Sequence, residues 1–257
     1  MPANATIPAG ALYGFLLVLA RVGGALSFVP LPGFKSAPEG VRVALALGFT
    51  LALFSQWPVI RTSDVTVPVL AGWTLSEAAV GVAIGVCVAI TLETLTLAAQ
   101  VMGLQAGYAY ASTIDPNSEA DSGILLVMAQ LMGGMLFFVL GLDREVLRLL
   151  AQSLEKIPAG AFVFTRATAE PLIRLGATLF STGVRLALPV VALLVMVDVA
   201  LALLGRINAQ LQLLSLAFPA KMLTALVLLT WMASMFPRIL REIGGQAWIT
   251  MHRMLGV

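Results

Sequence analysis

Long apolar runs separated by short polar or proline-containing segments dominate this chain. Six runs stand out, at about residues 10–29, 41–57, 69–111, 124–142, 175–204 and 213–236. Inside lipid, only helices and closed barrels satisfy every backbone hydrogen bond, and these runs lack the alternating polarity of barrel strands. The pattern therefore predicts an all-α fold: a polytopic integral membrane protein with about six long apolar helical segments.

The third run is unusual in its length. Residues 69–111 contain only two charged side chains, Glu77 and Glu93, and the run is roughly twice the ~20 residues that a bilayer requires. We expect either one bent or very long helix, or two helices with a break between them.

Three further stretches are amphipathic. In residues 143–156 the apolar positions recur at helical spacing among charged ones. A second such stretch leads into the fifth run, and residues 237–257 form an amphipathic tail. Residues 1–10 contain no Lys or Arg, so we expect no cleavable signal peptide and a first apolar segment that stays in the mature chain.

Composition supports a membrane protein and excludes several other classes. Of 257 residues, 60% are hydrophobic and only 11% are charged, whereas soluble domains are closer to a quarter charged. So few polar side chains cannot coat a soluble body of this size, and much of the surface must face lipid or apolar partner subunits. A net charge of +2 without basic runs gives no argument for nucleic acid. No hydrophilic stretch is long enough for a second domain.

The sequence contains few residues suited to catalysis or metal binding. The chain has one histidine, His252, and one cysteine, Cys87, and it contains no nucleophile motif, phosphate loop or dinucleotide fingerprint. The acidic segment 115–126 alternates oxygen ligands, but Ala120 and Leu126 replace the Gly and Glu that a calcium-binding EF-hand loop requires. We expect no enzyme activity, no cofactor and no metal site.

Ionisable side chains inside the apolar runs are costly in hydrocarbon and should face protein or water. They are Arg21, Glu77, Glu93, Arg185 and Asp198. Two readings stay open: coupling sites of a secondary transporter, or pairs between the subunits of a complex.

Two polar segments are candidates for function. The first begins as a slim helix with Gln100 and Gln105 and breaks into a polar loop at Asp115-Pro116, because proline disfavours helical geometry in the residue before it. It is either a pore-lining loop or an ordinary exterior loop. The second, residues 206–219, is predicted to be the tip of a helical hairpin, with amides available for interhelical hydrogen bonds.

Several motifs together resemble the FliR family of flagellar biosynthetic proteins, which includes the matching subunit of virulence type III secretion systems. They are Arg21-Val-Gly-Gly, Pro30-Leu-Pro-Gly-Phe-Lys-Ser-Ala-Pro, Val41-Arg-Val-Ala-Leu-Ala-Leu, Gly81-Val-Ala-Ile-Gly85, Gly103-Leu-Gln-Ala-Gly-Tyr-Ala-Tyr-Ala-Ser-Thr-Ile-Asp-Pro-Asn-Ser118 and the late stretch 206–219. The resemblance covers most of the chain, and the pattern of Gln105 with Asp115-Pro116 is closer to the flagellar branch.

The resemblance implies a subunit of the type III secretion export gate in the bacterial inner membrane, at the flagellar basal body. Its partners would be FliP-like and FliQ-like subunits, with FlhB-like and FlhA-like components, around a channel for unfolded substrates. The chain would be one membrane domain, 1–257, with a FliP-like part at 10–165 and a FliQ-like hairpin and tail at 166–257. The alternatives are the virulence counterpart and a multi-pass secondary transporter.

The resemblance also implies roles for particular residues. A plug loop at about residues 106–122 would help to close the pore. The pore-plug and gating candidates are Gln105, Gly107, Tyr110, Asp115, Pro116, Asn117 and Ser118. The candidates for intersubunit packing or hydrogen bonding are Arg21, Gly81, Gly85, Gln100, Gly103, Arg206, Gln210 and Pro219.

Overall fold

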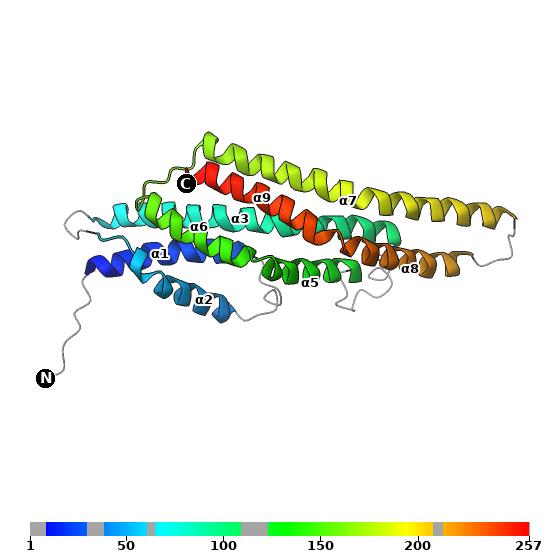
Figure 1. Cartoon of the computed structure of the whole chain (residues 1–257), viewed down its shortest axis with the longest axis horizontal. Coiled ribbons are helices and arrows are strands. Elements are labelled where there is room, and N and C mark those ends of the chain that lie inside the picture. The colour runs from blue at the N-terminus through cyan, green and yellow to red at the C-terminus, as the bar shows by residue number, and fades with distance from the viewer. Residues whose placement is uncertain (1–8, 30–38, 61–64, 109–122, 208–212, 257) are drawn as a thin grey trace. The chain divides into compact units, whose positions relative to one another are not determined.

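The computed structural model describes residues 9–29, 39–60, 65–108, 123–207 and 213–256, and its secondary structure is helical (Figure 1). Eight α-helices and one short 3-10 helix lie in these ranges. They are α1 (Ala9–Phe28), α2 (Glu39–Ala52), η2 (Phe54–Gln56), α3 (Val67–Ala106), α5 (Ile124–Val139), α6 (Leu142–Lys156), α7 (Arg166–Ile207), α8 (Leu213–Ala233) and α9 (Phe236–Leu255). The expectation of an all-α fold is confirmed.

Each apolar run predicted from the sequence contributes a helix, but not every helix is long enough to cross a bilayer. By length and composition α1, α3 and α7 are candidate spans, and the number rises to five if two helix pairs bent at short breaks, α5 with α6 and α8 with α9, each count as one. The second run forms only the 14 residues of α2, which at 1.5 Å per residue covers about 21 Å of a hydrocarbon core about 30 Å thick.

The third run forms one uninterrupted helix as far as Ala106. The 40 residues of α3 extend for about 60 Å, roughly twice the thickness of the hydrocarbon core. Of the alternatives left open by the sequence, the very long single helix is the one observed. The amphipathic stretch 143–156 is also helical, as α6, with Asp143 and Glu145 in its first turn and Lys156 in its last. These charges complement the partial charges at the helix ends.

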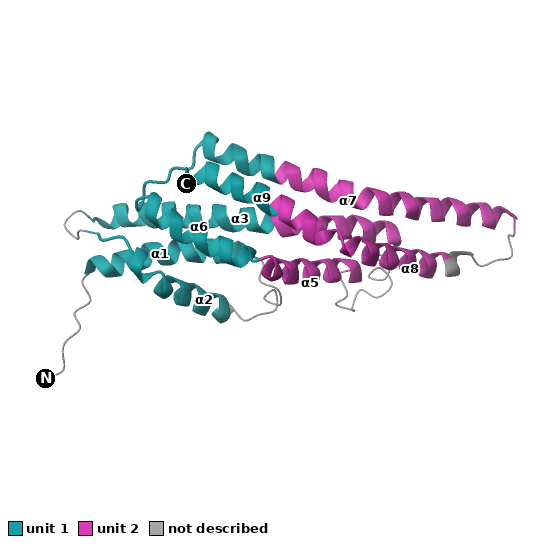
Figure 2. Ribbon diagram, in the orientation of Figure 1, with its two compact units in different colours: residues 1–90, 141–175, 244–257 teal, residues 91–140, 176–243 magenta. Residues whose placement is uncertain are grey.

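The described chain divides into two compact units that interleave along the sequence (Figure 2). Unit 1 comprises residues 1–90, 141–175 and 244–257, and unit 2 comprises residues 91–140 and 176–243. The long helices α3 and α7 each contribute residues to both units. The resemblance implies a division at residue 165 between a FliP-like part and a FliQ-like part. That division concerns likeness to other proteins and not compactness, and it stays a prediction.

One hydrophobic cluster of unit 1 forms where α1 packs on α2. Buried Val18, Val22 and Leu26 of α1 meet Ala46 of α2, and Trp57 covers the edge of this cluster. The Trp57 indole N–H donates to the Thr50 carbonyl at 2.9 Å, so its polar edge is satisfied while its ring is used for packing.

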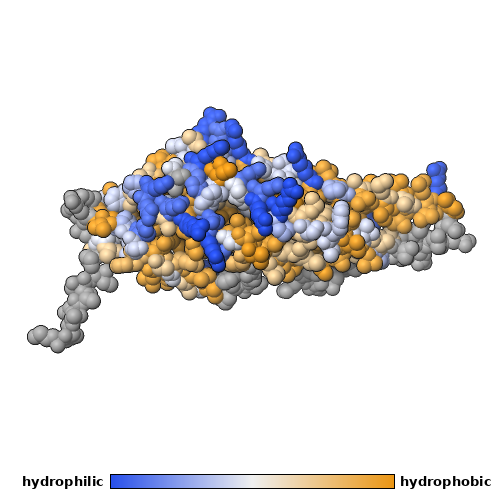
Figure 3. Space-filling view, viewed as in Figure 1, coloured by the Kyte–Doolittle hydropathy of each residue, from blue (hydrophilic) through white to orange (hydrophobic). Residues whose placement is uncertain are grey.

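Large apolar side chains remain exposed, above all on α7. Only 17% of the most apolar window of α7 is buried. On the face drawn in Figure 3, hydrophobic side chains cover the end of α7, whereas hydrophilic ones gather over its beginning and around α6 and α9. Such a surface needs lipid or apolar protein as its neighbour.

Candidate functional site

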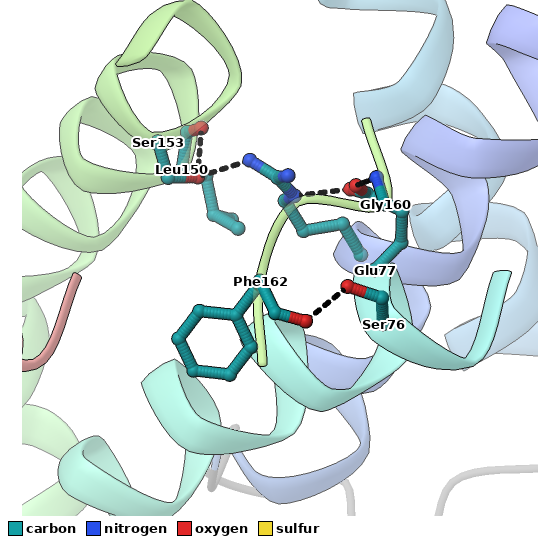
Figure 4. A network of polar contacts seen from close by, with 7 residues as sticks. Ser76, Glu77, Leu150, Ser153, Gly160 and Phe162 are labelled. Carbon is teal, nitrogen blue, oxygen red and sulfur yellow. Dashed lines mark hydrogen bonds and ion pairs between the residues drawn. The ribbon is translucent and has the colours of Figure 1, made fainter. Parts of the chain in front are cut away.

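A buried polar cluster in unit 1 joins α1, α3, α6 and the connector after α6 (Figure 4). We call it the Arg21 cluster: Arg21, Glu77, Ser153 and Gly160. The Arg21 Nε donates to Glu77 Oε2 at 2.6 Å, and Nη1 donates to Ser153 Oγ at 3.1 Å. The Gly160 backbone N–H donates to Glu77 Oε1 at 3.1 Å. Both carboxylate oxygens of Glu77 therefore have partners.

The ion pair is almost completely removed from solvent. The side chains of Arg21 and Glu77 are 1% and 2% exposed. Moving two such charges out of water costs several kcal/mol each, and attraction between them repays this only with good geometry and further hydrogen bonds. The contacts to Ser153 and Gly160 supply such bonds. The cluster thus specifies how four distant segments assemble and adds little net stability.

Glycines let α1 and α3 approach closely beside this ion pair. A Cβ added at Gly81 would collide with the backbone carbonyl of Arg21, and one at Gly85 would collide with the carbonyl of Ala25. On the other side of the crossing, a Cβ at Gly24 would lie 2.7 Å from the Ala78 oxygen. Backbone atoms cannot rotate away, so the Gly81-x-x-x-Gly85 motif works here as small-residue packing between helices of one chain.

The connector between α6 and α7 is held to α3 at two adjacent positions. Gly160 has φ +73°, a left-handed conformation that glycine adopts without strain, and a Cβ there would overlap the Trp73 ring. The Ser76 hydroxyl donates to the Phe162 carbonyl at 2.7 Å. Successive residues of α3, Ser76 and Glu77, therefore fix the path of the connector.

A second polar cluster lies in unit 2 and joins α3, α7 and α8. We call it the Asp198 cluster: Gln105, Asp198 and Lys221. Lys221 Nζ lies 2.9 Å from Asp198 Oδ1 and 3.0 Å from Oδ2, and Gln105 Nε2 donates to Oδ2 at 3.2 Å. The Asp198 side chain is 42% exposed and that of Lys221 is 13% exposed, so the lysine is the more dependent on its partner.

The chain that follows α3 is also attached to α8. Tyr108 donates its hydroxyl to the Met222 carbonyl at 2.9 Å, and burial raises the pKa of this phenol above its ordinary value. Gly107 has φ +86°, and a Cβ there would lie 3.1 Å from the Phe218 ring. Residues 105–108 are therefore fixed on α7 and α8 by three contacts, at Gln105, Gly107 and Tyr108, immediately before segment 109–122.

The structure brings two of the predicted plug residues, Gln105 and Gly107, into this attachment. The other plug candidates lie outside the described residues, as does one of the packing candidates. They are Tyr110, Asp115, Pro116, Asn117, Ser118 and Gln210.

The predicted packing residues occupy varied environments. Arg21, Gly81 and Gly85 make contacts within the chain. Gly103 is buried, with ordinary contact distance to Leu125. Gln100, Arg206 and Pro219 are exposed, the last inside α8. An intersubunit role for any of these residues stays a prediction.

Three residues of the two clusters were not singled out by the sequence: Ser153, Gly160 and Lys221. Lys221 could have been found, because it is the single charged residue of the apolar run 213–236. Like Asp198, it is a charge within an apolar run and needs a partner. Nothing in the sequence marks Ser153 or Gly160, since serine in an amphipathic helix and glycine in a turn are common.

The arrangement of the two clusters suits joining helices better than catalysing a reaction. Within the described ranges, no three His, Cys, Asp or Glu side chains group closely enough to hold a metal ion. Both clusters join segments far apart in the sequence, by 56 residues for Arg21 and Glu77 and by 93 for Gln105 and Asp198. Their chemistry is charge pairing and amide hydrogen bonding between helices.

Comparison with known proteins identifies the family. Residues 12–246 match the model of the bacterial export proteins, family 1. The flagellar biosynthetic protein FliR of Escherichia coli (strain K12) is 28% identical over 223 residues, which cover 86% of this chain and 83% of that protein. FliR of Bacillus subtilis (strain 168) is 25% identical over 251 residues, 95% of each chain. FliR of Caulobacter vibrioides is 26% identical over 230 residues, 88% of this chain and 90% of that protein.

The match runs through the residues that form both clusters and through most of the length of each relative. The chain therefore belongs to the bacterial export proteins of family 1, the FliR family, as a multi-pass membrane protein and a non-enzymatic export-gate component of the flagellar and type III export apparatus.

Proposed function

We propose that this chain is the FliR-type subunit of the flagellar export gate, in the inner membrane at the basal body. It forms, with FliP-like and FliQ-like subunits, the channel through which unfolded flagellar substrates leave the cell, next to FlhB-like and FlhA-like components. The flagellar branch is favoured because the relatives named above are flagellar biosynthetic proteins.

A loop from this chain, at about residues 106–122, helps to plug the closed pore in this proposal. The observation that supports it best is the attachment of residues 105–108. Gln105 and Tyr108 bind Asp198 and the Met222 carbonyl, while Gly107 packs on Phe218. A plug must stay in the pore while no substrate is passing. Attachment of residues 105–108 to α7 and α8 would keep the start of the segment in place while the rest of it is displaced.

The composition of residues 106–122 suits a segment that a passing substrate can displace. It has little side-chain bulk at Ala106, Gly107, Ala109 and Ala111, and glycine permits backbone conformations that other residues avoid. A passing substrate displaces such a segment at modest cost. The motive force comes from other components, since this sequence has no nucleotide-binding motif.

Sister subunits cover much of the apolar surface in this proposal. Helices α7 and α8 form the FliQ-like hairpin, with the hinge expected at residues 205–212, and residues 10–165 form the FliP-like part. The sparse burial of α7 supports this, because a helix that is apolar on all sides needs apolar neighbours.

The plug is tested by replacing residues 110–121 with a Gly/Ser linker of equal length, in the assembled complex. We expect small-ion leakage across the membrane to rise, because the linker keeps the connection but loses the side chains that seal the pore. A Gly/Ser replacement of N-terminal residues 2–6 is the control and should leave leakage unchanged. Unchanged leakage in the 110–121 variant, with the complex intact, would refute the plug.

The alternatives make different predictions. A secondary transporter would move its solute as the isolated chain in liposomes, whereas a gate subunit co-purifies with small hydrophobic helical partners in mild detergent. Mass spectrometry of those partners also separates the flagellar gate from its virulence counterpart.

A further inference from the structure

One face of the second half of α3 is open to a neighbour and carries an unneutralised charge. Among residues 91–106 only Glu93, Gln100 and Leu104 are exposed, and the rest are buried or half-buried. The three positions are separated by seven and four residues, so at 100° per residue they fall within a sector of about 40°. We call them, with half-buried Leu97 between them, the Glu93 stripe.

The stripe has the spacing of a helix-pairing seam. Glu93, Leu97, Gln100 and Leu104 follow intervals of four, three and four residues, the repeat at which one helix meets a partner along its length. Leu97 lies at the edge of the stripe, since its Cδ2 would be 2.9 Å from a Cβ on Gly183 of α7. A further helix placed on the stripe would therefore also approach α7.

Glu93 lies within every span of α3 that leaves out Glu77. Between Glu77 and Asp115 it is the single charged residue. Every stretch of about 20 residues, the length of one crossing, that fits within residues 78–108 contains position 93. A charge inside the hydrocarbon core is costly unless it faces protein or water.

The described part of the chain offers Glu93 no cation. Its carboxylate accepts a hydrogen bond from the Thr96 hydroxyl of the same helix, and no basic side chain of the described residues pairs with it. The exposed Gln100 likewise has no side-chain partner among them. By contrast, Glu77 on the same helix is fully satisfied by Arg21 and Gly160.

We propose that the Glu93 stripe docks an apolar helix of another membrane subunit. That helix carries a Lys or Arg opposite Glu93 and a hydrogen-bonding side chain about two turns away, opposite Gln100. Leucines between and beyond the two polar positions favour a packed helix over an aqueous channel, because a water-lining face would not alternate with leucine at this spacing. The inference rests on the proposed function in one respect: the partner belongs to the same membrane assembly.

The experiment uses the full chain expressed with its export apparatus. A photoreactive p-benzoylphenylalanine at position 104 is cross-linked, and the attached peptide is identified by mass spectrometry. We expect an apolar helix with a Lys or Arg placed opposite Glu93. Cross-links to lipid alone, or to a helix without such a residue, would overturn the proposal.

Charge variants provide the second readout. Glu93→Lys should lower the partner recovered with this chain by at least about tenfold, the scale for breaking a close charge pair, whereas Glu93→Gln should lower it less. Glu170→Lys is the control, because Glu170 is exposed beside Arg174 at the start of α7. Replacing the partner's Lys or Arg with Glu should restore the recovery of the partner with the Glu93→Lys variant. Such a rescue would exclude misfolding as the cause of the loss.

The two proposals fail in distinguishable ways. If the partner is an export-gate subunit but Glu93→Lys assembles like the wild type, the stripe is refuted and the gate function stands. If the cross-linked protein lies outside the export apparatus, the gate function fails.

Discussion

Arg21 of α1 and Glu77 of α3 form a 2.6 Å ion pair across 56 residues of sequence, in the interior of unit 1. A glycine-lined crossing of the same two helices lies one turn away, at Gly24, Gly81 and Gly85. The ion pair fixes the register of α1 on α3, and the glycines set the separation of the two helices. Without the close approach, the guanidinium would not reach a carboxylate that is also bound to Gly160.

Removal of either charge of this pair should be far more harmful than removal of both. Arg21→Met alone leaves a buried carboxylate without its cation, and we expect a loss of about 3–5 kcal/mol of stability. Glu77→Met should cost a similar amount. The double substitution should cost clearly less than the sum, because no buried charge remains. Thermal unfolding in detergent measures the cycle, and additive losses would contradict a coupled pair.

Gly81→Ala should disrupt the packing of α1 on α3. The added methyl group meets backbone atoms of Arg21 and Ala25, so the helices must separate, and overpacking of this kind costs about 1–3 kcal/mol. Gly72→Ala is the matched control in the same helix, because nothing lies near its Cβ position. There alanine should stabilise by up to about 1 kcal/mol through helix propensity. Protease resistance in membranes reports both changes, and equal effects would contradict the close approach.

The two charges of the Asp198 cluster should not be equivalent. Asp198→Ala leaves the ammonium of Lys221, 13% exposed, without an anion, whereas Lys221→Met leaves a carboxylate that is 42% exposed and still bound to Gln105. We therefore expect Asp198→Ala to loosen α8 from α7 more than Lys221→Met does. Disulfide trapping between cysteines placed on the two helices measures this. The reverse order would show that Lys221 is not the dependent partner.

Gly107→Ala should weaken the attachment of residues 105–108. Alanine in a left-handed conformation costs roughly 1–2 kcal/mol, and its Cβ would press on the Phe218 ring at 3.1 Å. Under the plug proposal, small-ion leakage should rise in the assembled complex. Gly123→Ala is the control, with its Cβ at an ordinary 3.6 Å from Tyr108. Combining Phe218→Leu with Gly107→Ala should recover only the part of the loss that is due to the contact with the Phe218 ring, because the backbone strain of alanine at position 107 remains.

The sequence by itself determined the all-helical membrane fold and the family. Residues 69–111 contain so few polar groups that only a helix in an apolar environment satisfies their backbone, and α3 forms there without a break. It also flagged Arg21, Glu77 and Asp198 as costly, since an isolated charge in an apolar run has no local partner.

Only the tertiary structure decided which of those charges meet. Glu77 and Glu93 look alike in the sequence, sixteen positions apart on one apolar helix. Glu77 is buried against Arg21 and Gly160, whereas Glu93 is exposed and, among the described residues, its carboxylate is bound by the Thr96 hydroxyl alone. The direction of a side chain around a helix is local, but the partners of Glu77 come from segments 56 and 83 residues away. Hydropathy reports only that a charge needs a partner, and long-range packing decides whether the chain itself provides one.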